Sequence, residues 1–517
     1  MFYAWPFATL LARGLGPGTA AETLGATWTW RVVWFTLWQA VASTILTLIV
    51  GLVPAVVMAR YHFPGRRLLD GLLASVFVLP TVVVGAAVLA LLPDSVDHGV
   101  LAILAAHVLF NLAVVVRTVG AVLTTVPRDL EHAAATLGAS PRRVFREITL
   151  PAITPALWAS AAIVFVFTFT SFGVVRLLGG VGRSTIEVEI WRQATQFGDI
   201  GAAATLTALQ LAVVAAAVAV SSSVQRRSSR SLALRVASTR QRPATTRQRW
   251  FVWSTVATTA TVALTPLAAL VERSIRLGDG YGLGAWRRLG DEAEVRPGLS
   301  TGIDPLASLA ASLQAMMLAT ALALVIGTLA SVAIASAGRF ALTLDTAMML
   351  PIATSAITVG FGMLITFDVE PVDWRSSWWL VPVGHALVAT PFVVRTVLPA
   401  LRGVDATRLE AAATLGASPL RAWREIVVPH LRRPVVVAAG LSAAISLGEF
   451  GATSFLSRSG QETMPIAIER LLGRTGAILH AQGYVLAVIL AAATIVVVTA
   501  LDLAHSTGSR PGSRAGS

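Results

Sequence analysis

The sequence predicts an all-α polytopic membrane protein, with two homologous parallel-repeat halves of about six transmembrane helices each. Of the 517 residues, 55% are hydrophobic and only 13% are charged, whereas soluble domains carry about 25% charged residues. Apolar stretches long enough to cross a bilayer core recur along the chain. The nine residues AAATLGASP occur at Ala133–Pro141 and again at Ala411–Pro419, 278 positions further on. Together these features indicate a duplicated membrane protein.

Hydropathy predicts eleven spans. They are 32–59, 68–92, 99–123, 155–175 and 200–220 in the first half, and 250–271, 306–336, 342–367, 377–400, 434–456 and 481–501 in the second. These segments are apolar all round, whereas the helices of a soluble protein carry an apolar stripe. The pattern therefore favours a membrane bundle over a soluble one.

The first half lacks one span of the expected set. Trp5–Leu15 resembles Thr265–Ile275, which closes the first span of the second half, but only five residues precede Pro6. Either the start codon lies further upstream, or a clipped stub stands in place of the first helix. We expect no cleavable signal sequence, because no basic segment precedes a short apolar core with a cleavage site.

Basic loops alternate with loops that are poor in arginine. The basic ones include 60–67, 117–146 and 402–433, and the positive-inside rule places them in the cytoplasm. We expect a multi-pass protein of a prokaryotic plasma membrane, in contact with lipid. Its predicted parts are the first half 1–224, a basic linker 225–249, the second half 250–503 and a polar tail 504–517. The linker has eight arginines and no acid, so we expect a tether attracted to anionic lipid, with a regulatory segment as the alternative.

Composition excludes several kinds of chemistry. The chain has no cysteine, and all 40 basic residues are arginine. A standard ATP-hydrolysing P-loop needs a lysine, so any ATP used must be hydrolysed by a partner. The net charge of +13 follows membrane topology and does not indicate a nucleic-acid partner. We expect no cofactor, no metal site and no catalytic residue. His107 and His385, in equivalent positions, are expected to bond to neighbouring helices.

The residues of the repeated loop predict its local structure. Alanine, leucine and glutamate favour a short helix, and a glycine then supplies its left-handed end. A Ser-Pro pair follows, which is typical of the start of a second helix, and a later proline is expected to end that helix. Two nearly identical cytoplasmic loops favour a partner site over mere connectors. These residues are Gly138, Ser140, Pro141 and Pro151 in the first copy, and Gly416, Ser418, Pro419 and Pro429 in the second.

The second copy, EAAATLGASPLRAWREIVVP, resembles the E-A-A-x3-G-x9-I-x-L-P loop of the permease subunits of ATP-binding-cassette importers, with Val428 in place of the usual leucine. The resemblance implies a coupling helix in each loop, an ATPase dimer on the cytoplasmic face and an extracytoplasmic solute-binding protein. The first copy has His132 at the glutamate position and Glu131 one residue earlier. The coupling residues so assigned are Glu131, His132, Ala133, Ala134, Gly138, Ile148 and Pro151 in loop 1, and Glu410, Ala411, Ala412, Gly416, Ile426 and Pro429 in loop 2.

The fusion of two permease halves resembles thiamine and ferric-iron permeases, and SLGEFGATSFL at Ser446–Leu456 is similar to the thiamine, molybdate and sulfate branches. The resemblance implies thiamine uptake, with iron or an oxyanion as the alternative. Glu449, in an apolar segment, and its counterpart Ser171 are candidates for the translocation path. Alternatively, neighbouring hydroxyls hold the Glu449 carboxylate. The rival from another class is a secondary transporter, which requires paired broken helices and buried charges.

Overall fold

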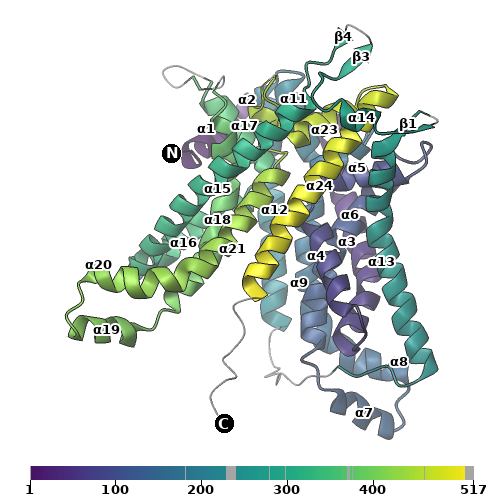
Figure 1. Cartoon of the computed structure of the whole chain (residues 1–517), viewed down its shortest axis with the longest axis vertical. Coiled ribbons are helices and arrows are strands. Elements are labelled where there is room, and N and C mark those ends of the chain that lie inside the picture. The colour runs from purple at the N-terminus through teal and green to yellow at the C-terminus, as the bar shows by residue number, and fades with distance from the viewer. Residues whose placement is uncertain are drawn as a thin grey trace. The chain divides into compact units, whose positions relative to one another are not determined.

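The computed structural model describes residues 2–14, 16–180, 182–228, 240–278, 280–296, 299–368, 373–374, 377–458 and 460–506. Residues 229–239 of the predicted linker and 507–517 of the predicted tail lie outside these ranges. The chain packs into two compact units (Figure 1). We call Gly14–Arg273 the N-unit, and Met1–Arg13 with Ser274–Ser517 the C-unit.

The N-unit is entirely helical in its described part, and its centre is the packing of α3, α6 and α9. Ala55, Val115 and Ile153 are fully buried where these helices meet. Its elements are α2 (Pro17–Gly25), α3 (Thr27–Arg60), α4 (Arg66–Val78), α5 (Thr81–Leu91), α6 (Val100–Leu123), α7 (Arg128–Thr136), α8 (Pro141–Val144), the π-helical turn η1 (Phe145–Thr149), α9 (Leu150–Phe169), α10 (Gly173–Leu178), α11 (Ile186–Thr195), α12 (Ile200–Ser228) and α13 (Thr246–Ile275), which passes into the C-unit at its last two residues.

The C-unit repeats this arrangement with α15, α18 and α21 at its centre, where Ala323, Val393 and Val427 are buried. Its helices are α1 (Ala4–Gly14), α14 (Gly284–Arg287), α15 (Pro305–Ser336), the 3-10 turn η2 (Gly338–Phe340), α16 (Ala341–Ala353), α17 (Ala356–Thr366), α18 (Leu380–Arg402), α19 (Ala406–Thr414), α20 (Pro419–Ala422), the π-helical turn η3 (Trp423–Val427), α21 (Val428–Gly448), α22 (Thr453–Leu456), α23 (Met464–Leu472) and α24 (Ala477–Ser506). Two small antiparallel sheets pair β1 (Arg276–Leu277) with β2 (Gly280–Tyr281), and β3 (Glu294–Arg296) with β4 (Leu299–Ser300).

Nine helices in the described part of the chain are long and apolar enough to span a membrane, and two further pairs qualify only as bent spans. The segment predicted as a span at 68–92 is bent: α4 and α5 meet at 106°. The break falls at Pro80, whose ring disfavours the helical conformation for the residue before it. Leu79 accordingly has ψ 141°.

The segment predicted as a span at 342–367 is also bent, because α16 and α17 meet at 89°. Thr354 adopts an extended conformation with ψ 145°. Ser355 then starts α17, since its Oγ accepts a hydrogen bond from the Thr358 amide at 3.2 Å. A hydropathy window averages over such a break and cannot detect it.

The first helix of each sequence half packs with the other half. The predicted stub is the 11-residue helix α1 of the C-unit, where the Phe2 and Phe367 ring centroids lie 5.5 Å apart. In the N-unit, Val252 of α13 is fully buried against Val57 and Leu112. Packing therefore divides the chain at points that differ from the ends of the repeated sequence.

Glycines allow the central helices of each unit to cross closely. A Cβ at Gly51 of α3 would lie 2.8 Å from the Cβ of Val115 on α6. A Cβ at Gly327 of α15 would lie 2.6 Å from the Cβ of Val393 on α18. Val115 and Val393 are repeat equivalents, so both units use the same close contact, which small residues permit between membrane helices.

We expect Gly327→Ala to destabilise the C-unit by about 1–3 kcal/mol, because the added methyl group overlaps Val393. Thermal unfolding in detergent measures this. Gly71→Ala in α4 is the matched control, since nothing lies within 4 Å of its Cβ position, and it should leave the unfolding temperature unchanged or raise it. Equal behaviour of the two variants would contradict the close crossing.

Candidate functional site

The two copies of the repeated loop fold alike. α7 and α19 are both nine residues long and both end at a left-handed glycine, Gly138 with φ 84° and Gly416 with φ 79°. The amide of Ala139 bonds to the carbonyl of Ala134 at 3.0 Å, and Ala417 bonds to Ala412 at 2.9 Å. This is the Schellman ending of a helix, which glycine favours. It confirms the turn expected from the sequence.

The second helix of each loop starts as expected. The Oγ of Ser140 accepts a hydrogen bond from the Arg143 amide at 3.4 Å, and Ser418 accepts one from Arg421 at 3.3 Å. Pro141 and its equivalent Pro419 occupy the first helical position.

The expectation that Pro151 and Pro429 end this second helix is wrong. Residues 141–169 and 419–448 each run as one long helical segment that continues through the proline. A π-helical turn precedes each proline, and there the Leu150 amide bonds to the Phe145 carbonyl, as Val428 bonds to Trp423. Five-residue spacing of the hydrogen bonds widens the helix, so the proline does not terminate it. The short helix is thereby joined directly to a membrane span.

The assigned coupling residues have the same exposure at equivalent positions of the two loops. Six pairs share their class: His132 and Glu410, Ala133 and Ala411, Gly138 and Gly416, and Pro151 and Pro429 are exposed, whereas Ala134 and Ala412, and Ile148 and Ile426, are half-buried. His132 therefore stands where Glu410 stands in the other loop. The two loops present the same shape with a different polar group.

Sequence reasoning missed the most exposed apolar side chain of each loop. Leu137 is 88% exposed and its equivalent Leu415 is 87% exposed, one residue before the glycine. An isolated exposed leucine is common, but the same leucine at the tip of two duplicated loops indicates a contact surface. The recurrence of this leucine in both copies of the repeat could have indicated the surface, but leucine also favours helix formation and was assigned only that role.

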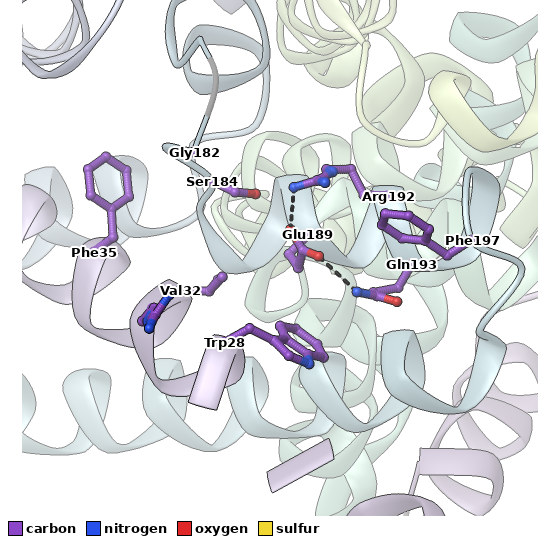
Figure 2. A pocket seen from close by; sticks show the side chains of 10 residues that line it. Trp28, Val32, Phe35, Gly182, Ser184, Glu189, Arg192, Gln193 and Phe197 are labelled. Atoms are coloured by element: carbon purple, nitrogen blue, oxygen red, sulfur yellow. Dashed lines mark hydrogen bonds and ion pairs between the residues drawn. The ribbon is translucent and has the colours of Figure 1, made fainter. Parts of the chain in front are cut away.

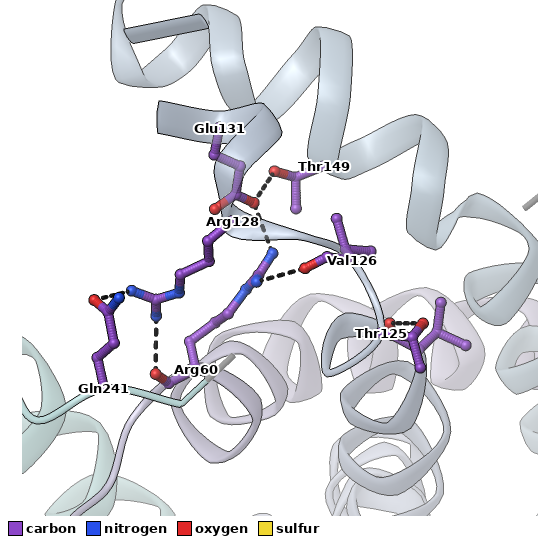
Figure 3. Close-up of polar contacts among 8 residues, drawn as sticks. Arg60, Thr125, Val126, Arg128, Glu131, Thr149 and Gln241 are labelled. Carbon is purple, nitrogen blue, oxygen red and sulfur yellow. Dashed lines mark hydrogen bonds and ion pairs between the residues drawn. The ribbon is translucent and has the colours of Figure 1, made fainter. Parts of the chain in front are cut away.

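Glu131 points into the N-unit (Figure 3). Its Oε1 lies 2.6 Å from the Nη2 of Arg60 and accepts a hydrogen bond from the Thr149 hydroxyl at 2.9 Å. Its side chain is only 21% exposed. The Glu131 carboxylate of loop 1 is thus already bonded to groups within the N-unit. In the described residues the Glu410 carboxylate of loop 2 makes no ion pair or hydrogen bond.

Glu449 is buried at the end of α21. Its Oε1 accepts a hydrogen bond from the Ala452 amide at 2.7 Å, and its backbone carbonyl accepts one from the Thr453 hydroxyl at 3.1 Å. Among the described contacts, the carboxylate is held by backbone at the turn into α22 rather than by hydroxyls. This turn positions it. Its place in a translocation path stays a prediction.

Ser171 belongs to a buried hydroxyl–imidazole arrangement that occurs in both units. His107 bonds to Ser171 at 2.8 Å and to Ser43 at 3.0 Å. His385 bonds to Ser446 at 2.8 Å and to Thr453 at 2.7 Å. Both rings therefore connect helices, as expected. Within the ranges that the structure describes, no three His, Asp or Glu side chains gather to hold a metal ion.

A pocket of about 360 Å³ lies between the first turns of α3 and α11 in the N-unit (Figure 2). Within the unit, α11 lies at the end away from α7 (Figure 1). The Glu189 carboxylate in its wall bonds to Arg192 at 3.1 Å and to Gln193 at 2.8 Å. Trp28, Phe35 and Phe197 also line it, so the pocket offers aromatic surface and a carboxylate that is already paired.

We expect Gly416→Val to impair transport while the protein still accumulates in the membrane. Nothing lies within 4 Å of the added Cβ, so the cost is that of a left-handed backbone, about 1–2 kcal/mol or more for a branched residue. Gly416→Asn is the control, because asparagine tolerates this conformation. Equal transport by the two variants would contradict the role of the turn.

A duplicated bundle of membrane-length helices with two equivalent exposed loops is the architecture expected of a multi-pass membrane transport permease. The sequence matches the family of binding-protein-dependent transport system inner membrane components twice, at residues 48–233 and 323–506. The chain belongs to this family and is a permease of an ATP-binding-cassette importer with two fused halves.

Related permeases share the two-half length. The chain is 28% identical over 476 residues to the thiamine transport system permease protein of Brucella melitensis, which covers 89% of this chain and 85% of the relative. It is 27% identical over 474 residues to the thiamine transport system permease protein of Escherichia coli, with 86% and 84% covered. Both alignments are too long to lie within one half.

Proposed function

We propose that this chain couples ATP hydrolysis by a separate ATPase dimer to the uptake of a solute. The observation that carries this proposal is the pair of exposed loops with one backbone geometry and a leucine at each tip. Two equal docking elements suit a dimeric partner. The chain itself contributes no bond-breaking chemistry.

The loops are built to transmit motion. In each loop the glycine turn ends the first short helix and a serine caps the start of the second. The π-helical turn then joins the second short helix to a long span, α9 or α21. A displacement of the partner's surface would therefore move the span with the loop. An extracytoplasmic solute-binding protein would act from the other side, and the two partners together would bias two packings of similar free energy.

Thiamine is the solute that we propose. Two relatives that align with most of the chain are named as thiamine transport permeases, and the buried Glu449 would suit a cationic solute. Ferric iron or an oxyanion such as molybdate or sulfate is the alternative. A secondary transporter is the second candidate, since the bent pairs α4–α5 and α16–α17 supply one feature that such a carrier requires.

The uptake experiment separates these candidates. Liposomes would carry the chain with an ATPase and a solute-binding protein of the same transport system, and uptake of radiolabelled thiamine and of ferric iron would be measured with and without ATP. We expect thiamine uptake that needs ATP and both partners. Uptake by the chain alone would contradict the coupling function, and ATP-dependent uptake of iron but not thiamine would contradict the solute.

We expect Leu415→Arg to weaken association with the ATPase by roughly 30-fold, because a buried apolar anchor contributes about 2 kcal/mol. Leu420→Arg is a matched control on the same loop. Leu420 is also exposed, but its equivalent in loop 1 is Arg142, so this substitution should leave association unchanged. A pull-down titration measures both. Similar losses for the two variants would argue against a leucine-centred contact.

A further inference from the structure

Arg60 is a buried cation at the end of a membrane span. It is the last residue of α3 and is only 5% exposed. Its Nη2 pairs with the Glu131 carboxylate at 2.6 Å, and its Nη1 donates a hydrogen bond to the Val126 carbonyl at 3.0 Å. Burial of an unpaired guanidinium is costly, so Arg60 and Glu131 depend on each other. The pair joins α3 to the helix α7 of loop 1.

We call the contacts that attach loop 1 to the end of α3 the joint. It contains further hydrogen bonds besides the Arg60–Glu131 ion pair. Thr149, in the π-helical turn, donates a hydrogen bond to the same Glu131 oxygen. Arg128, one turn before Glu131, donates to the Arg60 carbonyl at 2.8 Å and to the Gln241 side chain at 2.7 Å. Figure 3 shows Glu131 and Arg128 each bonded to Arg60, with Thr149 bonded to Glu131 and Gln241 bonded to Arg128. α7 and η1 of loop 1 and the end of α3 are thus held together by hydrogen bonds to charged groups, which are shorter and stronger than neutral ones.

Among the residues that the structure describes, loop 2 has no such arrangement of charged contacts. Leu409 and Val427 stand 278 positions after Glu131 and Thr149. Val427 is buried in an apolar cluster against which Leu409 packs. α15, the equivalent of α3, ends at Ser336, whose hydroxyl bonds to the Val332 carbonyl of its own helix. The second loop is therefore attached by apolar packing, which is not directional.

We propose that Glu131 is a positioning residue inside this subunit: with Arg60 and Thr149 it fixes α7 to α3, so that loop 1 moves α3 directly. This inference rests on the proposed coupling function. Glu131 cannot serve a partner's surface without leaving Arg60 unpaired. The two loops therefore meet the ATPase with unlike groups, His132 and Glu410, and transmit motion through unlike joints.

The first test uses the chain alone. Because it has no cysteine, spin labels at Leu68→Cys in α4 and at Leu137→Cys, directly after α7, report one distance without background labelling; both side chains are exposed. We expect Glu131→Gln to broaden the distance distribution at least twofold. The triple variant Arg60→Ser/Glu131→Leu/Thr149→Val carries the residue that ends α15 and the two equivalent residues of loop 2, and it should restore a narrow distribution. An unchanged width in Glu131→Gln would overturn the joint.

The second test uses the complex with the ATPase. We expect Glu131→Gln to bind the ATPase within twofold of the wild type but to transport at least tenfold less solute per ATP hydrolysed, and the triple variant to recover most of that ratio. Glu410→Gln should instead weaken ATPase binding. If Glu131→Gln weakens binding as much as Glu410→Gln, Glu131 is a surface contact and the inference fails. If the wild type does not bind the ATPase at all, the coupling function fails while the first test still decides the joint.

Discussion

A bilayer core offers no water to the backbone, so every peptide group inside it needs a partner within the protein. This constraint makes the chain helical, and it also decides where the helices can break. At the breaks, side chains replace the lost bonds. Thr36 accepts the Ile186 amide at 3.0 Å, and Ser312 accepts the Met464 amide at 2.7 Å. These bonds start α11 and α23 in the two units, and Glu449 serves the turn into α22 in the same way.

The two halves share their backbone turns, caps and helix crossings more strictly than the polar groups around them. The Schellman turn, the serine cap, the π-helical turn and the exposed leucine recur in both loops, and the glycine crossing recurs in both units. The groups that attach the loops differ: Arg60 and Glu131 in one, Leu409 in the other. A shared backbone fixes the shape presented to a dimeric partner, whereas each loop can be fastened to its own unit by different chemistry.

Local features were predictable from the sequence, and long-range ones were not. The glycine turn at Gly416 and the cap at Ser418 follow from residues within five positions of one another, so the repeat predicted them. The ion pair of Glu131 joins residues 71 positions apart, and no periodicity indicates it. The bend at Pro80 was missed because hydropathy does not record direction. The continuation of the helix through Pro151 was not predicted, because a proline usually stops a helix. Here a π-helical turn precedes the proline.

The exchange of first helices has a consequence for biosynthesis. Domains generally fold from the N-terminus as the chain leaves the ribosome, but the N-unit is complete only after residue 273 has been made. α1 precedes the other described helices, yet its aromatic contacts, such as that of Trp5 with Phe367, are synthesised more than 350 residues later. A helix made early is thus among the last to find its place, and a chain cut at the linker would yield a leading fragment that lacks α13.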